Sequence, residues 1–380
     1  MSNILLAIYF LLGITFFWLT FVKDKPSEKK LFRILSTIFV VSLPFAITSW
    51  IPAFNHALLF AIMAIGLNIL LGNAGLISLG HAAFYALGAY ATAILVVFLG
   101  IPIFIAILFG AIITAMLAFI LGTPILRLKS HFLGIATLGL HVVIEEIIKV
   151  QLKDIFPAAQ VVYKYSIGSM SESLVYTLKE ILGNIEYAFV VLGESKPFYH
   201  SFLESITSSL SIMTVFFATL IIITLLVYMA RNILRTKIGR ALSAIRDSEI
   251  AARALGVNLA VYKNIAFALS AFFAAIAGGI WALSIGQLGE ENFSILISLL
   301  VLAQIVLGGL GSIQGAIIGA VIFKLLDIKI IKLFLGDSAS AQAWSPFILG
   351  ATVVAFIIFA PKGLVYMFYQ LKLKIKQKRG

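Results

Sequence analysis

Long apolar runs separated by short polar stretches follow one another along nearly the whole chain. Eleven apolar segments recur, at residues 3–22, 31–50, 55–71, 80–99, 102–121, 131–150, 209–229, 264–285, 294–308, 311–326 and 345–360. Most have about the 20 residues that a helix needs to cross the hydrocarbon core of a bilayer. The pattern therefore predicts an all-α fold, a polytopic transmembrane helix bundle that forms one membrane domain over residues 1–380.

Two of these segments, 55–71 and 294–308, are short and run into glycine. Asn68-Ile69-Leu70-Leu71-Gly72-x-x-Gly75 at the first break matches Gln304-Ile305-Val306-Leu307-Gly308-x-x-Gly311 at the second. Such a pair favours broken helices beside a transport path, because irregular backbone at membrane depth must be buried or line a cavity. Close helix packing at the glycines is the alternative. Packing is the favoured interpretation for a stripe at every fourth residue: Gly311, Gly315 and Gly319.

A charged stretch, Ile238–Asn258, interrupts the apolar pattern. Asp247 or Ser248 can cap a short helix at its N-terminus, Glu249 suits the first turn, and Gly256 suits the position after the C-terminus. A helix of about two turns is not stable alone. It must pack on a partner protein, which its charged residues favour, or on the chain's own transmembrane helices.

Composition and charge agree with a membrane protein and predict its orientation. Hydrophobic residues make up 62% of the chain and charged residues 12%, too few to cover a soluble core. The net charge of +12 reflects Lys and Arg in loops, which gather on the cytoplasmic side. Threading the segments with the N-terminus outside and the C-terminus in the cytoplasm places 20 of the 28 basic residues inside. We therefore expect a multi-pass protein of the cell (inner) membrane.

The same threading separates three flanking parts from the central spans. Residues 1–50 form extra N-terminal spans, the first of them uncleaved, and residues 361–380 form a basic cytoplasmic tail. Residues 151–208 form an extracytoplasmic insertion, in which Ser171–Leu192 has the apolar spacing of a helix lying on the membrane or on the outer rim. The insertion either docks a partner or is passive.

The chain contains no motif of a self-contained enzyme. A phosphate-binding G-x-x-x-x-G-K-[ST] loop cannot occur, because no glycine is followed by lysine. Metalloprotease, serine-hydrolase and paired metal-ligand spacings are missing as well, and there is no cysteine for a disulfide or a thiolate metal site. We expect no enzyme activity, metal or cofactor in this chain, so any ATP that drives it binds elsewhere.

Several ionisable residues have pairing partners at helical spacing. Glu145 and Lys149 form an i,i+4 pair near a span end, and Glu249 can pair in the same way with Arg253. Lys324 and Asp327 form an i,i+3 pair near another outer end. An interfacial ion pair is the favoured interpretation at 145–149. A proton relay is the alternative, with candidate residues His141, Glu145 and Glu146.

Polar groups beside the glycine breaks suit a wet translocation path. His81, at the start of a span, is expected to anchor its turn through a backbone carbonyl. The candidate path residues are Asn68, Ser78, His81, Gln304, Ser312 and Gln314.

Three blocks of the sequence resemble the inner-membrane permeases of branched-chain amino-acid ABC importers. They are Gly66–Tyr90, Ile238–Lys263 and Leu307–Ala320, and the likeness extends over a permease core of residues 54–365. The sequence Ile77-Ser78-Leu79-Gly80-His81-Ala82-Ala83-Phe84 is similar to that of the M-type rather than the H-type subunit. The resemblance implies a second, H-type permease subunit, two cytoplasmic ATPase subunits that bind ATP and Mg, and an extracytoplasmic substrate-binding protein. It implies no nucleic acid.

Importer permeases of this kind carry a coupling helix with a Glu-Ala-Ala-x-x-x-Gly pattern. Residues 249–256 fit it with one inserted residue, Ile250. The residues that the resemblance assigns to coupling with the ATPase are Arg240, Arg246, Asp247, Glu249, Ala251, Ala252, Arg253, Leu255 and Gly256.

The chain departs from the family pattern on the outer side. A Thr-Gly-Gly-x-x-Gly stretch is missing after segment 131–150, and the 151–208 insertion is longer than expected. Branched-chain, hydrophobic amino acids are the expected substrates, and urea or short amides are the alternative. A self-sufficient proton-coupled secondary transporter is the rival from another class, while a membrane-embedded enzyme has the least support.

Overall fold

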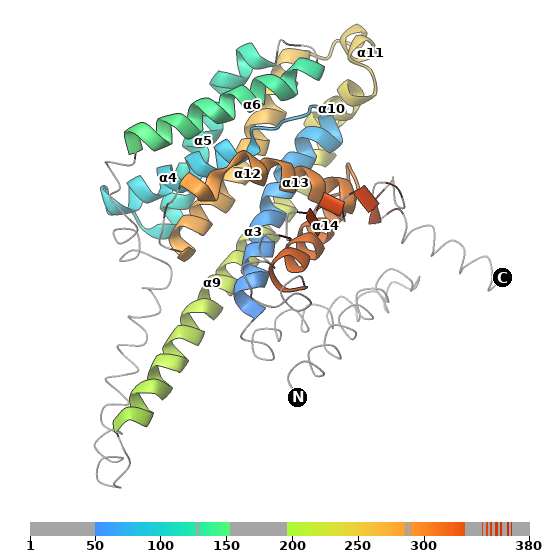
Figure 1. Cartoon of the computed structure of the whole chain (residues 1–380). Coiled ribbons are helices and arrows are strands. Elements are labelled where there is room, and N and C mark those ends of the chain that lie inside the picture. Colours follow the sequence, from blue (N-terminus) through green and yellow to red (C-terminus); the bar gives the residue numbers. More distant parts are fainter. Residues whose placement is uncertain are drawn as a thin grey trace, which may run out of the picture.

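The computed structural model describes residues 50–126, 128, 130–152, 196–285, 288, 290–330 and scattered positions between 344 and 366 (Figure 1). Within these residues every regular element is a helix, which confirms the all-α prediction. The helices are α3 (Ile51–Asn68), α4 (His81–Val97), α5 (Ile103–Ile125), α6 (Ser130–Ile147), α9 (Lys196–Arg235), α10 (Lys237–Asp247), α11 (Glu249–Ala254), α12 (Leu259–Ile285), α13 (Ile295–Gly308) and α14 (Ile313–Leu325). Short 3-10 or π-helical turns are η2 (Ile69–Asn73), η3 (Ile148–Leu152), η4 (Glu290–Phe293) and η5 (Leu326–Ile330).

Predictions for three regions fall outside the described residues. These are the N-terminal spans within residues 1–49, the centre of the insertion at 153–195, and the tail from residue 367 onward. The last part of the predicted insertion belongs to α9, which has 40 residues and is about 60 Å long at 1.5 Å per residue. Figure 1 shows its N-terminal part reaching beyond the other labelled helices.

The described helices include several of membrane-spanning length and composition. Ile51–Asn73, Ile103–Ile125, Met213–Arg235 and Leu259–Ala282 can each cross a bilayer. The pair Ile295–Gly308 and Ile313–Ile328 passes the same test jointly, with a bend of 119° between its halves. Segments 294–308 and 311–326 of the sequence are thus two arms with a sharp bend between them, which fits one broken span or a re-entrant loop.

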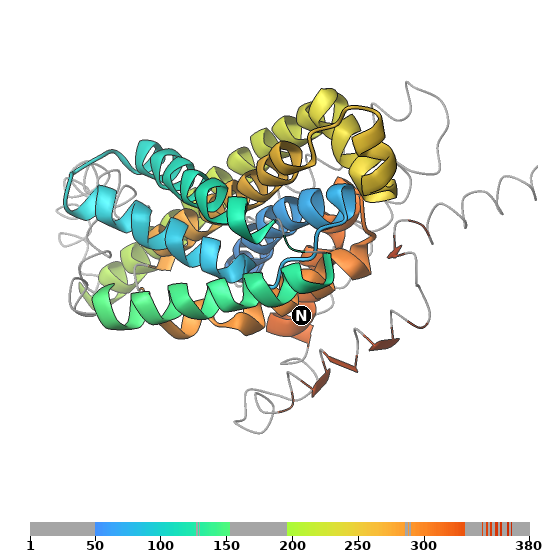
Figure 2. The same cartoon turned by 90° about the horizontal axis from the view of Figure 1, so that it is seen from above.

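Helix α12 lies at the centre of the bundle. It packs against α3, α4 and α5, while α14 and α9 cover another side of α3 (Figures 1 and 2). Small residues make the α4–α12 contact close: Gly88 lies against the backbone of Ala275, and Gly278 lies against the backbone of Tyr85. In a bilayer, lipid tails are as apolar as leucine, so this close van der Waals packing carries helix association.

Exposure separates the central helices from the outer ones. In the membrane-spanning windows of α3 and α12, 78% of the residues are buried, against 33% for α5 and α9. The outer face of α5 shows large apolar side chains, which suit contact with lipid: Phe104, Leu108, Phe109, Met116 and Ile120.

Candidate functional site

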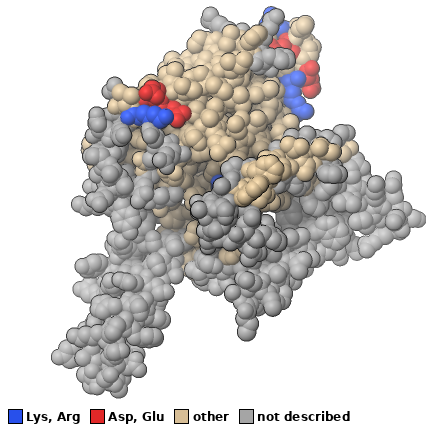
Figure 3. Space-filling view, viewed as in Figure 1, with Lys and Arg blue, Asp and Glu red and all other residues tan. Residues whose placement is uncertain are grey.

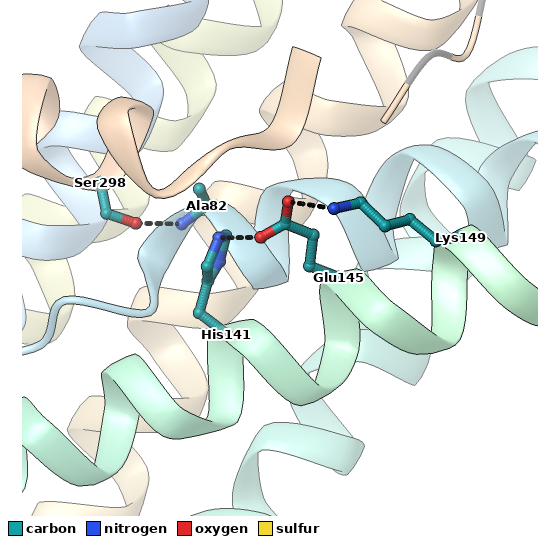
Figure 4. Close-up of polar contacts among 5 residues, drawn as sticks. All are labelled: Ala82, His141, Glu145, Lys149 and Ser298. Carbon is teal, nitrogen blue, oxygen red and sulfur yellow. Dashed lines mark hydrogen bonds and ion pairs between the residues drawn. The ribbon is translucent and has the colours of Figure 1, made fainter. Parts of the chain in front are cut away.

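The chain has no regular structure between η2 and α4, from Gly75 to Gly80. Hydroxyl groups of other helices accept hydrogen bonds from this irregular backbone and from the first turn of α4. The Leu79 N–H donates to Thr137 Oγ1 of α6 at 3.0 Å, and the Ala82 N–H donates to Ser298 Oγ of α13 at 2.8 Å (Figure 4). These contacts satisfy backbone groups that lipid could not satisfy, so the first predicted break is real and supported from two sides.

His81, the first residue of α4, is fully buried. Its Nε2 lies 3.2 Å from the carbonyl oxygen of Met63 in α3, and its Nδ1 lies 3.4 Å from Ser270 Oγ in α12. A carbonyl can only accept, so Nε2 carries the proton and the Ser270 hydroxyl donates to Nδ1. The predicted anchor through a backbone carbonyl is confirmed, and the imidazole ties α4 to α3 and α12.

The second break lies between α13 and α14. Gly309 and Gly311 have φ angles of +116° and +81°, and Ser312 caps α14 by accepting a hydrogen bond from the Gly315 N–H at 3.1 Å. Gly315 packs against the backbone of Gly308, and Gly319 packs against the backbones of Gln304 and Gly308. Packing is therefore confirmed for Gly315 and Gly319. Gly311 lies in the turn before α14, because the helix starts only at residue 313, so it does not share the helix face of the other two glycines.

The two breaks meet in space although 243 residues separate them. The Gly311 N–H donates to Asn68 Oδ1 at 2.8 Å, and Gly72 lies directly against the backbone of Gly311. We call Asn68, Gly72, Gly75 and Gly311 the glycine joint. The paired sequence pattern thus marks two segments that pack on each other.

Four of the candidate path residues are fully buried polar side chains: Asn68, Ser78, His81 and Gln304. Within the described part of the chain, Asn68 Nδ2, Ser78 Oγ and both amide atoms of Gln304 have no hydrogen-bond partner. Such buried groups cost free energy unless water or a ligand meets them. Gln314, in the first turn of α14, is exposed.

The predicted short helix in the charged stretch is α11, and its caps are those that the sequence indicates. Ser248 rather than Asp247 is the N-cap, and its hydroxyl accepts from the Ala251 N–H at 3.2 Å. At the other end, Gly256 has a φ of +83°, and its N–H donates to the Arg253 carbonyl at 3.0 Å. A left-handed residue after the C-terminus satisfies the last carbonyls of the helix, and glycine adopts this conformation without strain.

One side of α11 packs on the bundle and the other is open. Ala252 is buried, whereas 86% of Ile250 and 81% of Leu255 is exposed. Glu249 pairs with Lys263 of α12 at 2.7 Å, so the predicted Glu249–Arg253 pair is wrong. Of the two alternatives, packing on the chain's own helices is therefore seen, because α11 contacts α12, and two apolar side chains of the α11 region remain exposed.

Arg246, at the end of α10, is exposed, but its guanidinium reaches the end of η2. Its Nη1 donates to the carbonyl oxygen of Gly72 at 2.6 Å, across 174 residues of sequence. No local pattern could have indicated this contact, because any backbone carbonyl is an equivalent acceptor in the sequence. Arg246 links the charged stretch to the glycine joint.

A row of polar groups lies along α6. Glu145 contacts Lys149 at 3.1 Å, which confirms the predicted pair, and its other oxygen lies 3.3 Å from Nε2 of the buried His141 (Figure 4). The contact with His141 has the distance of an ion pair without the geometry of a hydrogen bond. Glu146 is exposed. Lys324 and Asp327 also form their predicted pair, at 2.8 Å.

On the face that Figure 3 draws, most charges of the described residues gather at two separate places. Figure 3 shows one charged patch over the end of α6 and another over the α10–α11 corner, with uncharged surface between them. This distribution suits a protein whose apolar middle lies in a bilayer and whose charges lie at its two faces. Among the described residues, no group of three or more His, Cys, Asp or Glu side chains could hold a metal ion.

Comparison with known proteins agrees with this architecture. Residues 49–357 match the family described as branched-chain amino acid transport system / permease component. The chain is 30% identical over 367 residues, 96% of its length, to the high-affinity branched-chain amino acid transport system permease protein LivM of Salmonella typhimurium strain LT2, of which it covers 81%. The Escherichia coli K12 LivM protein matches to the same extent.

A shorter match covers part of the chain. It is 32% identical over 142 residues, 36% of its length, to the autoinducer 2 import system permease protein LsrC of Escherichia coli O9:H4, of which it covers 40%. No solved structure matches. The family match and the full-length likeness to LivM together place the chain, a multi-pass membrane protein, among the permease components of branched-chain amino acid transport systems.

Proposed function

We propose that this chain is the M-type membrane subunit of an ATP-binding-cassette importer for branched-chain amino acids. The observation that carries the proposal is α11, a capped short helix with Ile250 and Leu255 exposed, in a chain that belongs to this permease family. Large apolar side chains at the water-facing end of a membrane protein mark a protein interface. The substrate follows from the two relatives, which are named for branched-chain amino acid transport.

The proposal assigns the other tasks to partner chains. Two cytoplasmic ATPase subunits bind ATP and Mg, while this chain holds neither. A second, H-type permease completes the membrane part, and an extracytoplasmic protein delivers the substrate. In this arrangement the N-terminus lies outside and the C-terminus in the cytoplasm, since the basic residues then gather inside.

In the proposed mechanism, closure of the ATPase dimer moves α11. The Glu249–Lys263 ion pair joins α11 to α12, and α12 packs against α3, α4 and α5, so the movement reaches the centre of the bundle. Substrate crosses beside Asn68, Ser78, His81 and Gln304. Their unpartnered buried polar atoms are available to water or to the polar groups of a substrate.

Introduction of a negative charge at the exposed apolar side chains of α11 and its C-cap tests the docking. In the reconstituted complex, Ile250→Asp and Leu255→Asp should each reduce co-purification of the ATPase subunits at least about tenfold, because a desolvated carboxylate opposes an apolar interface. Val261→Asp is the matched control, since Val261 is 45% exposed at the start of α12, outside α11. The control should assemble normally. Normal assembly of both α11 variants would reject the proposal.

The alternative function, a proton-coupled transporter, has one structural observation in its favour, the contact of buried His141 with Glu145 at 3.3 Å. The two functions differ in what this chain does alone. Vesicles that contain only this chain should not accumulate a branched-chain amino acid under a proton gradient. Uptake without partner subunits would favour the alternative, and uptake of urea or a short amide by the full complex would correct the substrate.

A further inference from the structure

The side chain of Arg246 completes the cap of the first broken span. At the end of η2, the carbonyl of Leu70 accepts from the Leu76 N–H and the carbonyl of Leu71 accepts from the Gly75 N–H, each at 3.1 Å. The carbonyl of Gly72 accepts from Arg246 Nη1 at 2.6 Å. The last carbonyls of a helix lack intrahelical partners and carry partial negative charge, so a cation placed there stabilises the helix end.

The same guanidinium lies next to the second break. A Cβ atom on Gly311 would lie 3.2 Å from Arg246 Nη1, and one on Gly75 would lie 3.5 Å from Arg246 Cα. Gly311 in turn donates its N–H to Asn68 Oδ1 at 2.8 Å. Arg246 therefore contacts both sides of the glycine joint, where the arms of the two broken segments meet.

Arg246 is also close in the chain to the docking helix. Only Asp247 and Ser248 separate it from α11, and Ser248 is at once the last cap of α10 and the first cap of α11. The backbone of Ser248 is already extended, with a φ of −164°, so the connection between the two helices can lengthen little further. A displacement of α11 must therefore reach Arg246.

We propose that Arg246 is the positioning residue that transmits movement of the ATPase-docked α11 to the glycine joint, and that it does not itself contact the ATPase. This inference rests on the proposed function, and it assigns Arg246 a role different from that of Ile250 and Leu255. The Glu249–Lys263 pair moves the central helix α12, whereas Arg246 moves the irregular backbone beside the buried Asn68. The two links act on different parts of the path.

The experiment uses the complete importer in proteoliposomes, with the substrate a branched-chain amino acid. Arg246→Gln should leave co-purification of the ATPase subunits and basal ATP hydrolysis within about twofold of the wild type. It should lower the amount of substrate moved per ATP at least about tenfold, as expected for loss of one charge-assisted hydrogen bond. Arg246→Lys keeps the charge but has a shorter, unforked group. The amount of substrate that it moves per ATP should lie between the values of the wild type and Arg246→Gln. Arg231→Gln is the matched control, an exposed arginine of α9 whose loss should change none of these quantities.

A second measurement does not depend on transport. Hydrogen exchange of the detergent-solubilised complex should change on ATP binding at both 249–256 and 70–76 in the wild type. In Arg246→Gln, or in Arg246→Lys if the first variant does not fold, the change should persist at 249–256 and be lost or weakened at 70–76.

The possible outcomes separate this inference from the proposed function. Loss of the ATPase subunits from Arg246→Gln would make Arg246 a docking residue and overturn the inference alone. Unchanged coupling in both Arg246 variants, or an unchanged response at 70–76, would also overturn it. No response to ATP at 249–256 in the wild type would overturn the proposed function and the inference together.

Discussion

Lys263 Nζ lies 2.7 Å from Glu249 Oε1, so a largely buried lysine of α12 holds the first turn of α11. The side chain of Lys263 is 8% exposed and that of Glu249 is 41% exposed. The pair is therefore asymmetric: the carboxylate still reaches water, whereas the ammonium group has little solvent to replace its partner. Removal of the acid and removal of the base should have different consequences.

We expect Glu249→Ala to destabilise the protein more than Lys263→Met. The first change leaves a buried ammonium group unpaired, at a cost of about 1–2 kcal/mol after allowance for the exposure of Glu249. The second replaces the lysine with an apolar chain of similar shape and should cost less than about 1 kcal/mol. The midpoint of unfolding of the purified chain measures both, and the double variant should resemble Lys263→Met. The reverse order would show that the ion pair does not hold α11.

Close contact between α13 and α14 predicts the effect of a single methyl group. A Cβ atom on Gly319 would lie 2.8 Å from the Gly308 nitrogen, within the backbone of the facing arm. Gly319→Ala should therefore cost about 1–3 kcal/mol, because two backbones must move apart. Gly139→Ala is the matched control: Gly139 lies inside α6 with nothing within 4 Å of an added Cβ. It should be neutral or stabilising by about 0.5–1 kcal/mol. Equal stability of the two variants would contradict the close packing.

Features with a local physical cause were predictable from the sequence. The helical segments follow from apolar length alone, and the ends of α11 follow from Ser248 and Gly256, since each acts on backbone groups within three residues or so. The glycines at the ends of the two short segments likewise indicate where the helices break. The lesson from Gly311 is that equal spacing of glycines does not fix where a helix begins.

Features decided by tertiary proximity were not predictable. The i,i+4 spacing predicts Arg253 as the partner of Glu249, but the fold brings Lys263 of α12 next to Glu249 instead. The Lys263 side chain is largely buried, so little solvent competes with this ion pair. The acceptor for Arg246 is a backbone carbonyl, which every residue has, so the sequence carries no sign of Gly72. The exposure of Gln314 depends on how the first turn of α14 is rotated, which the turn at 309–312 determines.

The polar row on α6 gives a prediction about energy coupling. Glu145→Gln keeps an oxygen that can accept from Lys149 and remain beside His141, while it removes the charge that a proton relay needs. If ATP drives transport, the complete importer with this variant should keep its transport rate within about twofold, since an ion pair that water still reaches contributes only about 0–1 kcal/mol. Uptake is measured with and without a protonophore. A loss of transport in the variant, together with inhibition of the wild type by the protonophore, would assign Glu145 to proton transfer.

The two contacts of His81 differ in strength, and their removal should differ accordingly. His81→Ala takes away the bond to the Met63 carbonyl at 3.2 Å and leaves the Ser270 hydroxyl without the ring nitrogen that it meets at 3.4 Å. Loss of a buried donor with its packing should cost about 1–3 kcal/mol and lower the yield of folded protein. Ser270→Ala removes only the longer contact and should cost less than about 1 kcal/mol. The midpoint of unfolding separates these effects.

The KM for transport should be unchanged in Ser270→Ala, because that hydroxyl holds the His81 ring in place from the side of α12. A raised KM at normal stability would instead mean that the hydroxyl itself meets the substrate.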